Sequence, residues 1–307
     1  MEQYSATRLV ERARIKAKRE FLRSPIARPW SDNRYNSRLG RHAENLPWIT
    51  RDRFDIFAEL RDHGIAVRDG TTTIPAAVIE VADRFVDRLR ETAQKSLKTT
   101  LPTRMPEITL PIDIPDMPTD SAPAYEWGLA EENLDLAERY IGLPVFFLGV
   151  AVRRERADGP SDYHTRRWHM DIDDRRMLKI IVYLNDVGDG CGPFEYLDRD
   201  ASDHAVRILR YSAGHVSDAA MARVVPAEDW VQVTGPRLTA IFVDPKRLLH
   251  RVRPPTQADR YSLTFTYTST TPLFQFQTFP ESRLSPAALA GLSKELTPRQ
   301  RRAAMGK

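Results

Sequence analysis

The sequence is poor in cysteine: Cys191 is the only one among its 307 residues. A single cysteine excludes an internal disulfide framework and is typical of proteins from a reducing compartment. The first twenty residues, rich in arginine and lysine, contain no apolar core of the kind that a secretory signal needs. The sequence therefore predicts a cytoplasmic protein.

Long hydrophobic runs are also absent. The longest candidate, "IGLPVFFLGVAV", covers only 141–152 and includes a proline, whereas a membrane-spanning helix needs roughly 18 to 20 apolar residues. We expect no membrane span. A hydrophobic content of 41% beside 29% charged residues instead favours a globular domain with its own core.

The net charge is only +4, but positive residues gather in the first forty residues and in the C-terminal stretch "KELTPRQRRAAMGK". Such ends could bind an anionic partner or could simply be solvated. No zinc-finger spacing and no RNA-binding aromatic signature accompanies them, so nucleic acid is not an expected partner. Nothing in the sequence indicates an oligomeric state.

The first half of the chain favours helices. Apolar spacing predicts helices over 6–23, 51–63, 74–97 and 131–141, with Gly64 and Gly142 at two of the ends. The stretch 28–47 looks irregular. Six prolines between 101 and 123 exclude a regular helix or a central strand there, and this stretch could be a linker or a loop lying over a site. We favour the loop.

From about residue 144 onward the pattern is one of short strands separated by Gly, Pro and Asp, which is typical of an antiparallel sandwich or barrel. In "RYSLTFTYT" an apolar set that includes Phe265 alternates with a polar set that includes Ser262. A sheet with one solvated face would give the same alternation. The amphipathic helices need an apolar surface to cover, which favours a barrel with a polar interior and helices outside. A polar insertion covers about 198–228, and "SPAALAGLSKEL" near the C-terminus predicts a last helix.

We therefore expect a mostly β protein with flanking helices. It would consist of a basic helical arm over 1–45, a single domain over 46–270 with its barrel core at about 140–268, and a helical tail over 271–307.

The stretch "RRWHMDIDDRRML" contains a histidine and an aspartate two residues apart, His169 and Asp171. On an extended strand both side chains point to one side and could bind one metal ion. Among the candidates for a third ligand, His250 lies between two predicted strands, whereas His164, His204 and His215 lie in a loop or in the polar insertion.

Two imidazoles and one carboxylate leave three positions open on an octahedral ion, as in non-haem Fe(II) oxygenases. Arg260 follows His250 by ten residues. Its guanidinium suits the far carboxylate of 2-oxoglutarate, a co-substrate that chelates such an ion.

Two stretches, "RRWHMDIDDRRMLKIIVYLNDVGDGCGPFEYL" and "VTGPRLTAIFVDPKRLLHRVRPPTQADRYSLTFTY", resemble the Fe(II)/2-oxoglutarate oxygenases, and most closely their phytanoyl-CoA dioxygenase-like branch. The resemblance implies a double-stranded β-helix wrapped by helices. It also implies iron bound by His169, Asp171 and His250, and 2-oxoglutarate held by Arg260 and Ser262. Two further residues on the inward face of a strand, Lys179 and Tyr183, would help. The family's Gly-Ser-His motif is replaced by "EYLDRDASDH" here.

The activity implied is hydroxylation or another oxidation of an unactivated C–H bond in a small metabolite. O2 would be consumed, with succinate and CO2 as co-products. A macromolecular or carrier-bound substrate, and a non-catalytic cupin-like metal-binding protein, are the alternatives. Arg154 and Arg156 could face the cavity and bind an anionic substrate. The carboxylates and arginines next to the triad, Asp173 and Asp174 included, are expected in a solvated loop, and 101–123 and 198–228 are candidate walls or lids of the site.

Overall fold

The structure is a computed structural model that describes residues 17–18, 20–21, 24–96, 107–111, 118–158, 164–274, 291 and 296–306. Most of the helix expected over 6–23 and most of the one expected near the C-terminus lie outside these residues. Part of the proline-rich stretch is described, and the expectation that it forms no regular helix is wrong for α5 (Pro118–Gly128), which contains Pro123. The chain divides into two compact units, 1–47 and 48–307.

The first unit contains the helix α2 (Ala27–His42), followed by the short 3-10 turn η1 (Ala43–Asn45). The expectation of irregular structure over 28–47 is therefore wrong. α2 has no side-chain N-cap, but Arg41 and His42 occupy its last turn. Cations there interact favourably with the helix dipole.

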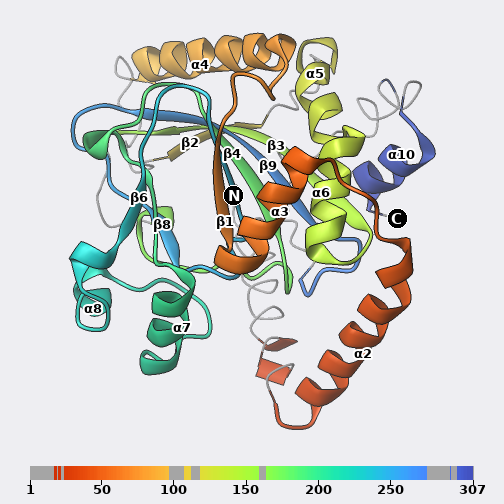
Figure 1. The fold of residues 1–307 in the computed structure, drawn as a ribbon. Coiled ribbons are helices and arrows are strands. Elements are labelled where there is room, and N and C mark those ends of the chain that lie inside the picture. The colour runs from red at the N-terminus through yellow and green to blue at the C-terminus, as the bar shows by residue number, and fades with distance from the viewer. Residues whose placement is uncertain are drawn as a thin grey trace, which may run out of the picture. The chain divides into compact units, whose positions relative to one another are not determined.

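The second unit is built on two antiparallel sheets (Figure 1). Every strand pair in both is antiparallel. The larger sheet has the order β1-β7-β4-β9-β3-β2 and the smaller one the order β6-β5-β8. The larger sheet consists of β1 (Ile65–Asp69), β2 (Glu107–Pro111), β3 (Val145–Glu155), β4 (Leu178–Tyr183), β7 (Thr239–Val243) and β9 (Arg260–Ser269). The smaller sheet consists of β5 (Phe194–Tyr196), β6 (Val231–Val233) and β8 (His250–Val252).

One hydrophobic cluster joins the two sheets. Tyr183, Ile241 and Val243 of the larger sheet share it with Phe194 and Val233 of the smaller one. The sheets therefore pack against each other through their inner faces, and polar residues on those faces are enclosed between them.

Helices cover the outside of the larger sheet (Figure 1). They are α3 (Arg51–His63), α4 (Ala76–Ser96), α5 (Pro118–Gly128) and α6 (Glu131–Ile141). α3 and α6 end at Gly64 and Gly142, both in the left-handed conformation that glycine adopts without strain. The expected ends of these two helices are thus confirmed.

Both faces of β9 are buried. Its apolar side chains face the helices: Phe265 packs edge-on against Trp127 of α5, with ring centroids 4.6 Å apart. On the other face Ser262 and Thr264 are only 1% and 6% exposed. A sheet with one solvated face is therefore excluded for β9, and its polar face turns toward the interior.

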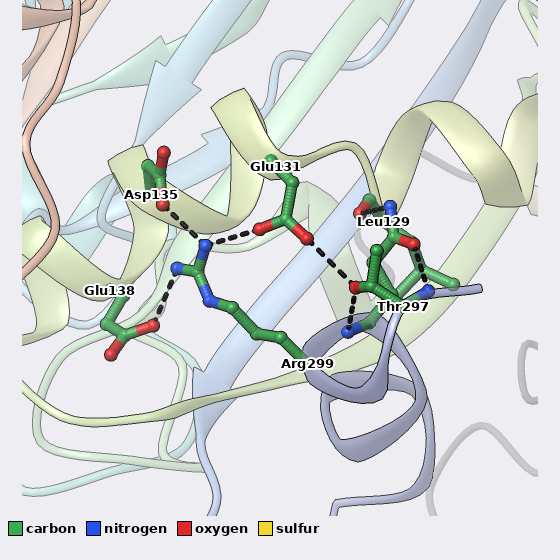
Figure 2. Close-up of polar contacts among 7 residues, drawn as sticks. Leu129, Glu131, Asp135, Glu138, Thr297 and Arg299 are labelled. Atoms are coloured by element: carbon green, nitrogen blue, oxygen red, sulfur yellow. Dashed lines mark hydrogen bonds and ion pairs between the residues drawn. The ribbon is translucent and has the colours of Figure 1, made fainter.

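The last helix, α10 (Pro298–Met305), is held on α6 by a cluster of charges (Figure 2). Arg299 binds three carboxylates that lie one or two turns apart on α6: Glu131 at 2.5 Å, Asp135 at 2.6 Å and Glu138 at 2.8 Å. Thr297 caps the helix and also donates a hydrogen bond to Glu131. This end of the expected C-terminal tail belongs to the same compact unit as the sheets.

The polar insertion forms a small substructure of its own. It contains α7 (Arg199–Ile208), α8 (Asp218–Met221) and the turn η4 (Ala227–Asp229). Its buried residues Ala205 and Met221 pack with Trp168 and Leu249, the neighbours of two expected metal ligands. Among the described helices, none combines the length and the apolar character needed to cross a membrane.

Candidate metal centre

A β-bridge holds the two expected histidine ligands side by side. The backbone N–H of His169 donates to the carbonyl of His250, and that of His250 to the carbonyl of His169, both at 3.0 Å. The backbone N–H of Asp171 donates to the carbonyl of Pro245 at 2.9 Å. The backbone therefore fixes all three residues before any side chain is considered.

Each of the three side chains directs one donor atom to a common point, with all three atoms within 4.8 Å of one another. Oδ1 of Asp171 lies 3.8 Å from Nε2 of His169 and 4.0 Å from Nε2 of His250. Within the described part of the chain, no other group of three His, Cys, Asp or Glu converges in this way.

Hydrogen bonds select the tautomer of both histidines. Nδ1 of His169 lies 2.8 Å from the carbonyl oxygen of Arg167, and Nδ1 of His250 lies 3.0 Å from that of Leu248. A carbonyl oxygen can only accept, so each Nδ1 carries the hydrogen. The lone pair of each Nε2 is left for a metal, which is the usual arrangement of ligand histidines.

The protonation states also suit a cation. Burial lowers the pKa of His169 to about 3 and lowers the pKa of His250 as well. Burial alone would raise the pKa of Asp171, but the charge of Lys179 and the two imidazoles outweigh it and hold that pKa below its usual range. At neutral pH the site therefore presents two neutral imidazoles and a carboxylate, the forms that bind metals.

The other candidate histidines do not join this group. His204 is exposed on α7, and the side chain of His164 lies outside the described residues. His215 is exposed, but its ring centroid is 5.4 Å from that of His169, because Val216 pairs with Trp168 in a second β-bridge. The insertion thus borders the metal centre.

Arg260, at the start of β9, is 4% exposed. Its Nη1 donates to the carbonyl of Gly192 at 2.8 Å, while its buried Nε has no hydrogen-bond partner. Among the described residues no carboxylate forms an ion pair with it. A buried guanidinium N–H without an acceptor is costly, so Arg260 is suited to binding a carboxylate.

Ser262 and Tyr183 lie opposite each other in the register of β9 and β4, on the same face as Arg260 and Lys179. Ser262 is 1% exposed. The Tyr183 hydroxyl is already engaged, since it donates to Val233 at 2.8 Å and accepts from the Phe194 N–H at 2.9 Å. Tyr183 thus links the two sheets next to Arg260. The guanidinium carbon of Arg260 lies 5.9 Å from the centroid of the Tyr183 ring.

Lys179 contacts a metal-ligand candidate directly: its Nζ lies 2.5 Å from Oδ2 of Asp171. The sequence placed Lys179 on the inward face but gave no sign of this partner.

Arg154 does not have the position expected of a cavity residue. Arg154 lies opposite Tyr261, on the face of the sheet that the helices cover, and forms an ion pair with Asp259. Arg156 forms an ion pair with Asp158. The residue that shares the face of Ser262 is Arg153, which the sequence analysis did not single out.

The loop around the triad is not solvated as expected. Asp174 is 3% exposed and accepts hydrogen bonds from the backbone N–H of Ser269 and of Arg175. Arg166 is 1% exposed and lies 3.3 Å from a carboxylate oxygen of the buried Glu155. Both charges are bonded to strands of the larger sheet, Arg166 to β3 and Asp174 to β9.

A second group of contacts, which the sequence did not reveal, joins the residues next to the two candidate histidine ligands. Arg251, which follows His250, packs against the rings of both Trp168 and Trp230, with its guanidinium carbon 4.9 Å and 5.1 Å from their centroids, and the two rings contact each other edge-on. Its Nε donates to the buried Glu195 at 2.5 Å. Residues directly adjoining both histidine ligands are thereby stacked together.

The buried carboxyl of Asp244 holds the turn that contains Pro245, whose carbonyl accepts the hydrogen bond from the Asp171 backbone. It accepts from the Tyr140 hydroxyl at 2.8 Å and from the backbone N–H of Lys246 and Met177 at 2.9 and 3.4 Å. Burial raises the pKa of Asp244 to about 6, although these hydrogen bonds act in the opposite direction.

We expect Asp244→Asn to gain stability relative to the wild type as the pH rises from 4 to 7. With a folded-state pKa above the unfolded one, the carboxyl binds more protons in the folded state, so its contribution to stability is lost as the pH rises through this window. At 1.36 kcal/mol per pKa unit, the loss is roughly 3 kcal/mol, and an amide does not titrate. Urea unfolding of both proteins at a series of pH values measures the difference in their free energies of unfolding.

Tyr140→Phe is the control, because it removes one hydrogen bond but keeps the titrating carboxyl, and it should retain the pH dependence. A difference in free energy of unfolding between Asp244→Asn and the wild type that stays constant with pH would contradict this account.

No family model and no curated protein sequence matches the chain. Several solved structures are similar to it. AviO1 from Streptomyces viridochromogenes Tue57 is 17% identical, with 73% of this chain and 98% of that chain covered and a TM-score of 0.49. EctD from S. alaskensis, with 2-oxoglutarate and 5-hydroxyectoine, is 16% identical over 77% of this chain and 78% of that chain, with a TM-score of 0.48. HygX from Streptomyces hygroscopicus, with nickel and 2-oxoglutarate bound, is 16% identical over 73% of this chain and 88% of that chain, with a TM-score of 0.47.

Proposed function

We propose that this protein is an Fe(II)- and 2-oxoglutarate-dependent oxygenase. The observation that carries the proposal is the convergence of His169, Asp171 and His250 on one point, with both imidazoles in the tautomer that frees Nε2. Two imidazoles and one carboxylate with open positions are the donor set of non-haem Fe(II) oxygenases. Structural zinc sites are instead closed by four protein ligands, commonly thiolates.

The buried Nε of Arg260 supports 2-oxoglutarate as the co-substrate. It is an unpartnered donor on the same inner face as Lys179, which contacts Asp171. The far carboxylate of 2-oxoglutarate would accept from Arg260 and from the Ser262 hydroxyl, while its other end chelates the metal. Tyr183 would act indirectly, because its ring packs against the guanidinium of Arg260.

When bound, Fe(II) would supply activation of O2, coupled to decarboxylation of 2-oxoglutarate to succinate and CO2. The chain's part is to bind and orient. The histidines and Asp171 would hold the ion, Arg260 and Ser262 would fix the direction of the co-substrate, and the apolar residues between the sheets would exclude water. No protein side chain needs to act as the oxidant.

On this proposal the two sheets are the walls of a double-stranded β-helix, and the chain is a basic arm over 1–45, a catalytic domain over 46–270 and a tail over 271–307. The substrate would be a small metabolite that is oxidised at an unactivated C–H bond. The insertion 198–228 is the candidate wall of its binding site, because His215 lies beside His169.

Succinate formation tests the proposal. Purified protein incubated with Fe(II), ascorbate, O2 and 2-oxoglutarate should form succinate slowly without substrate and faster with a pool of metabolites, in which one component gains 16 mass units. Omitting Fe(II) should abolish succinate formation. Iron binding without any succinate, with or without the pool, would instead indicate a non-catalytic metal-binding protein.

A further inference from the structure

The two carboxylate oxygens of Asp171 have different partners. Oδ1 is the oxygen that lies near Nε2 of both histidines, at 3.8 and 4.0 Å. Oδ2 lies 2.5 Å from Nζ of Lys179. A carboxylate can coordinate a metal through one oxygen or through both, so whatever holds Oδ2 decides between the two modes.

We propose that Lys179 is a positioning residue that keeps Asp171 a one-oxygen ligand. This inference rests on the proposed function, because it concerns the same metal centre. It gives Lys179 a different task from the 2-oxoglutarate contact expected from the sequence: the lysine binds Oδ2 and leaves only Oδ1 to the ion.

The fold holds both partners firmly. Lys179 lies on β4, inside the larger sheet, where its backbone is in register with Val243 of β7 on one side and Thr266 of β9 on the other. The backbone of Asp171 is fixed separately by its hydrogen bond to Pro245. The two side chains are 17% and 13% exposed. A charge-assisted hydrogen bond that is largely shielded from water is strong, and it restricts rotation of the carboxylate.

The consequence concerns the number of open coordination positions. Three protein donor atoms leave three positions on an octahedral ion, enough for a chelating co-substrate and O2. A two-oxygen Asp171 would occupy one of these positions. Lys179 would therefore keep the third position available, without touching the metal, the co-substrate or O2.

The charge of Lys179 adds a second effect. An ammonium group bound to a ligand carboxylate repels a divalent cation. Replacing Lys179 by a neutral residue should therefore make metal binding tighter, although the lost residue contacts a metal ligand. A purely structural role would have the opposite effect, because loosening the site would weaken metal binding.

Mn(II) is a suitable probe, because the relaxation of solvent protons reports how many water molecules it binds. In the wild type we expect three bound waters. In Lys179→Met and in Lys179→Gln, which is neutral and one bond shorter than lysine, we expect two waters and a Kd for Mn(II) about tenfold lower or more. Lys179→Arg, which keeps the charge and the donors, should retain three. Circular dichroism would establish that each variant is folded, and the glutamine variant covers the case in which methionine prevents folding.

Arg154→Met is the matched control. It removes an ion pair of similar exposure, with Asp259, from the opposite face of the same sheet, and should change neither the water number nor the Kd. Three waters on Mn(II) in both neutral variants of Lys179 would overturn the inference, whichever way the Kd moves. His250→Ala distinguishes failure of the proposed function from failure of the role of Lys179. Mn(II) binding that survives this change would refute the proposed function. Loss of Mn(II) binding in His250→Ala, combined with three waters in the Lys179 variants, would refute only the role of Lys179.

Discussion

Replacing His250 by Ala is expected to abolish Fe(II)-dependent turnover and to weaken metal binding by more than the 10- to 100-fold that is typical for loss of a ligand's supporting partner. The reason is that His250 supplies one of the three protein donor atoms that converge at the site among the described residues. Alanine keeps the backbone bridge to His169, in which only backbone atoms take part. Isothermal titration with Fe(II) under anaerobic conditions, together with succinate formation, measures both effects.

His204→Ala is the matched control, because this histidine is exposed on α7 and lies outside the ligand group. Alanine variants of His169 and Asp171 should behave like His250→Ala. Full activity of His250→Ala with normal iron content would show that the metal is bound elsewhere.

The second large effect is expected for Arg260→Ala, which should raise the concentration of 2-oxoglutarate required by roughly one to three orders of magnitude. A hydrogen bond to a charged group contributes about 1.5 to 3 kcal/mol, and each 1.4 kcal/mol corresponds to a tenfold change in affinity. The affinity for Fe(II) should change little, since Arg260 is not a ligand candidate. Titrating 2-oxoglutarate into the Fe(II)-loaded protein under anaerobic conditions measures the effect directly.

Arg154→Ala serves as the control here, because its guanidinium pairs with Asp259 on the face that the helices cover. If Arg260→Ala kept the wild-type dependence on 2-oxoglutarate, another cation of the inner face would have to anchor the co-substrate, and Lys179 would be the first to test.

The ligand group could be predicted from the sequence because its signal is local. His169 and Asp171 are two residues apart, and the chain has only seven histidines from which to choose a third. The buried polar face of β9 could be predicted for the same reason, since alternation along a strand needs no knowledge of its neighbours.

Which of two adjacent residues faces the interior could not be predicted, because this depends on the register of the strand pairing. Arg153 and Arg154 point to opposite faces, and a shift of one residue exchanges them. The pairing of β3 with β9 contains such a shift between Phe147 and Gly149. Gly149, which has a φ of 122° at this shift, is the local sign of the bulge, since a glycine inside a strand often marks one. It does not say which of the following arginines faces inward, and the structure has Arg153 on the inner face where Arg154 was expected.

Contacts between distant segments were missed for a related reason. The packing of Arg251 against Trp168 and Trp230 depends on how the two sheets and the insertion close, and so does the hydrogen bond from Lys179 to Asp171. Sequence patterns state which face a side chain occupies, but not which partner lies across the interior.

The β-bridge between His169 and His250 has a consequence for biosynthesis. The first two ligands leave the ribosome long before the third, and β1 must also wait for β7, since Ile65 pairs with Val243. Pairings between such distant segments form slowly, because the entropy of closing the intervening chain is lost before the contact stabilises anything. A nascent chain that ends before residue 250 therefore holds only two of the three candidate metal ligands. The three candidate donor atoms can converge only once β8 has been synthesised and has paired with the segment around His169.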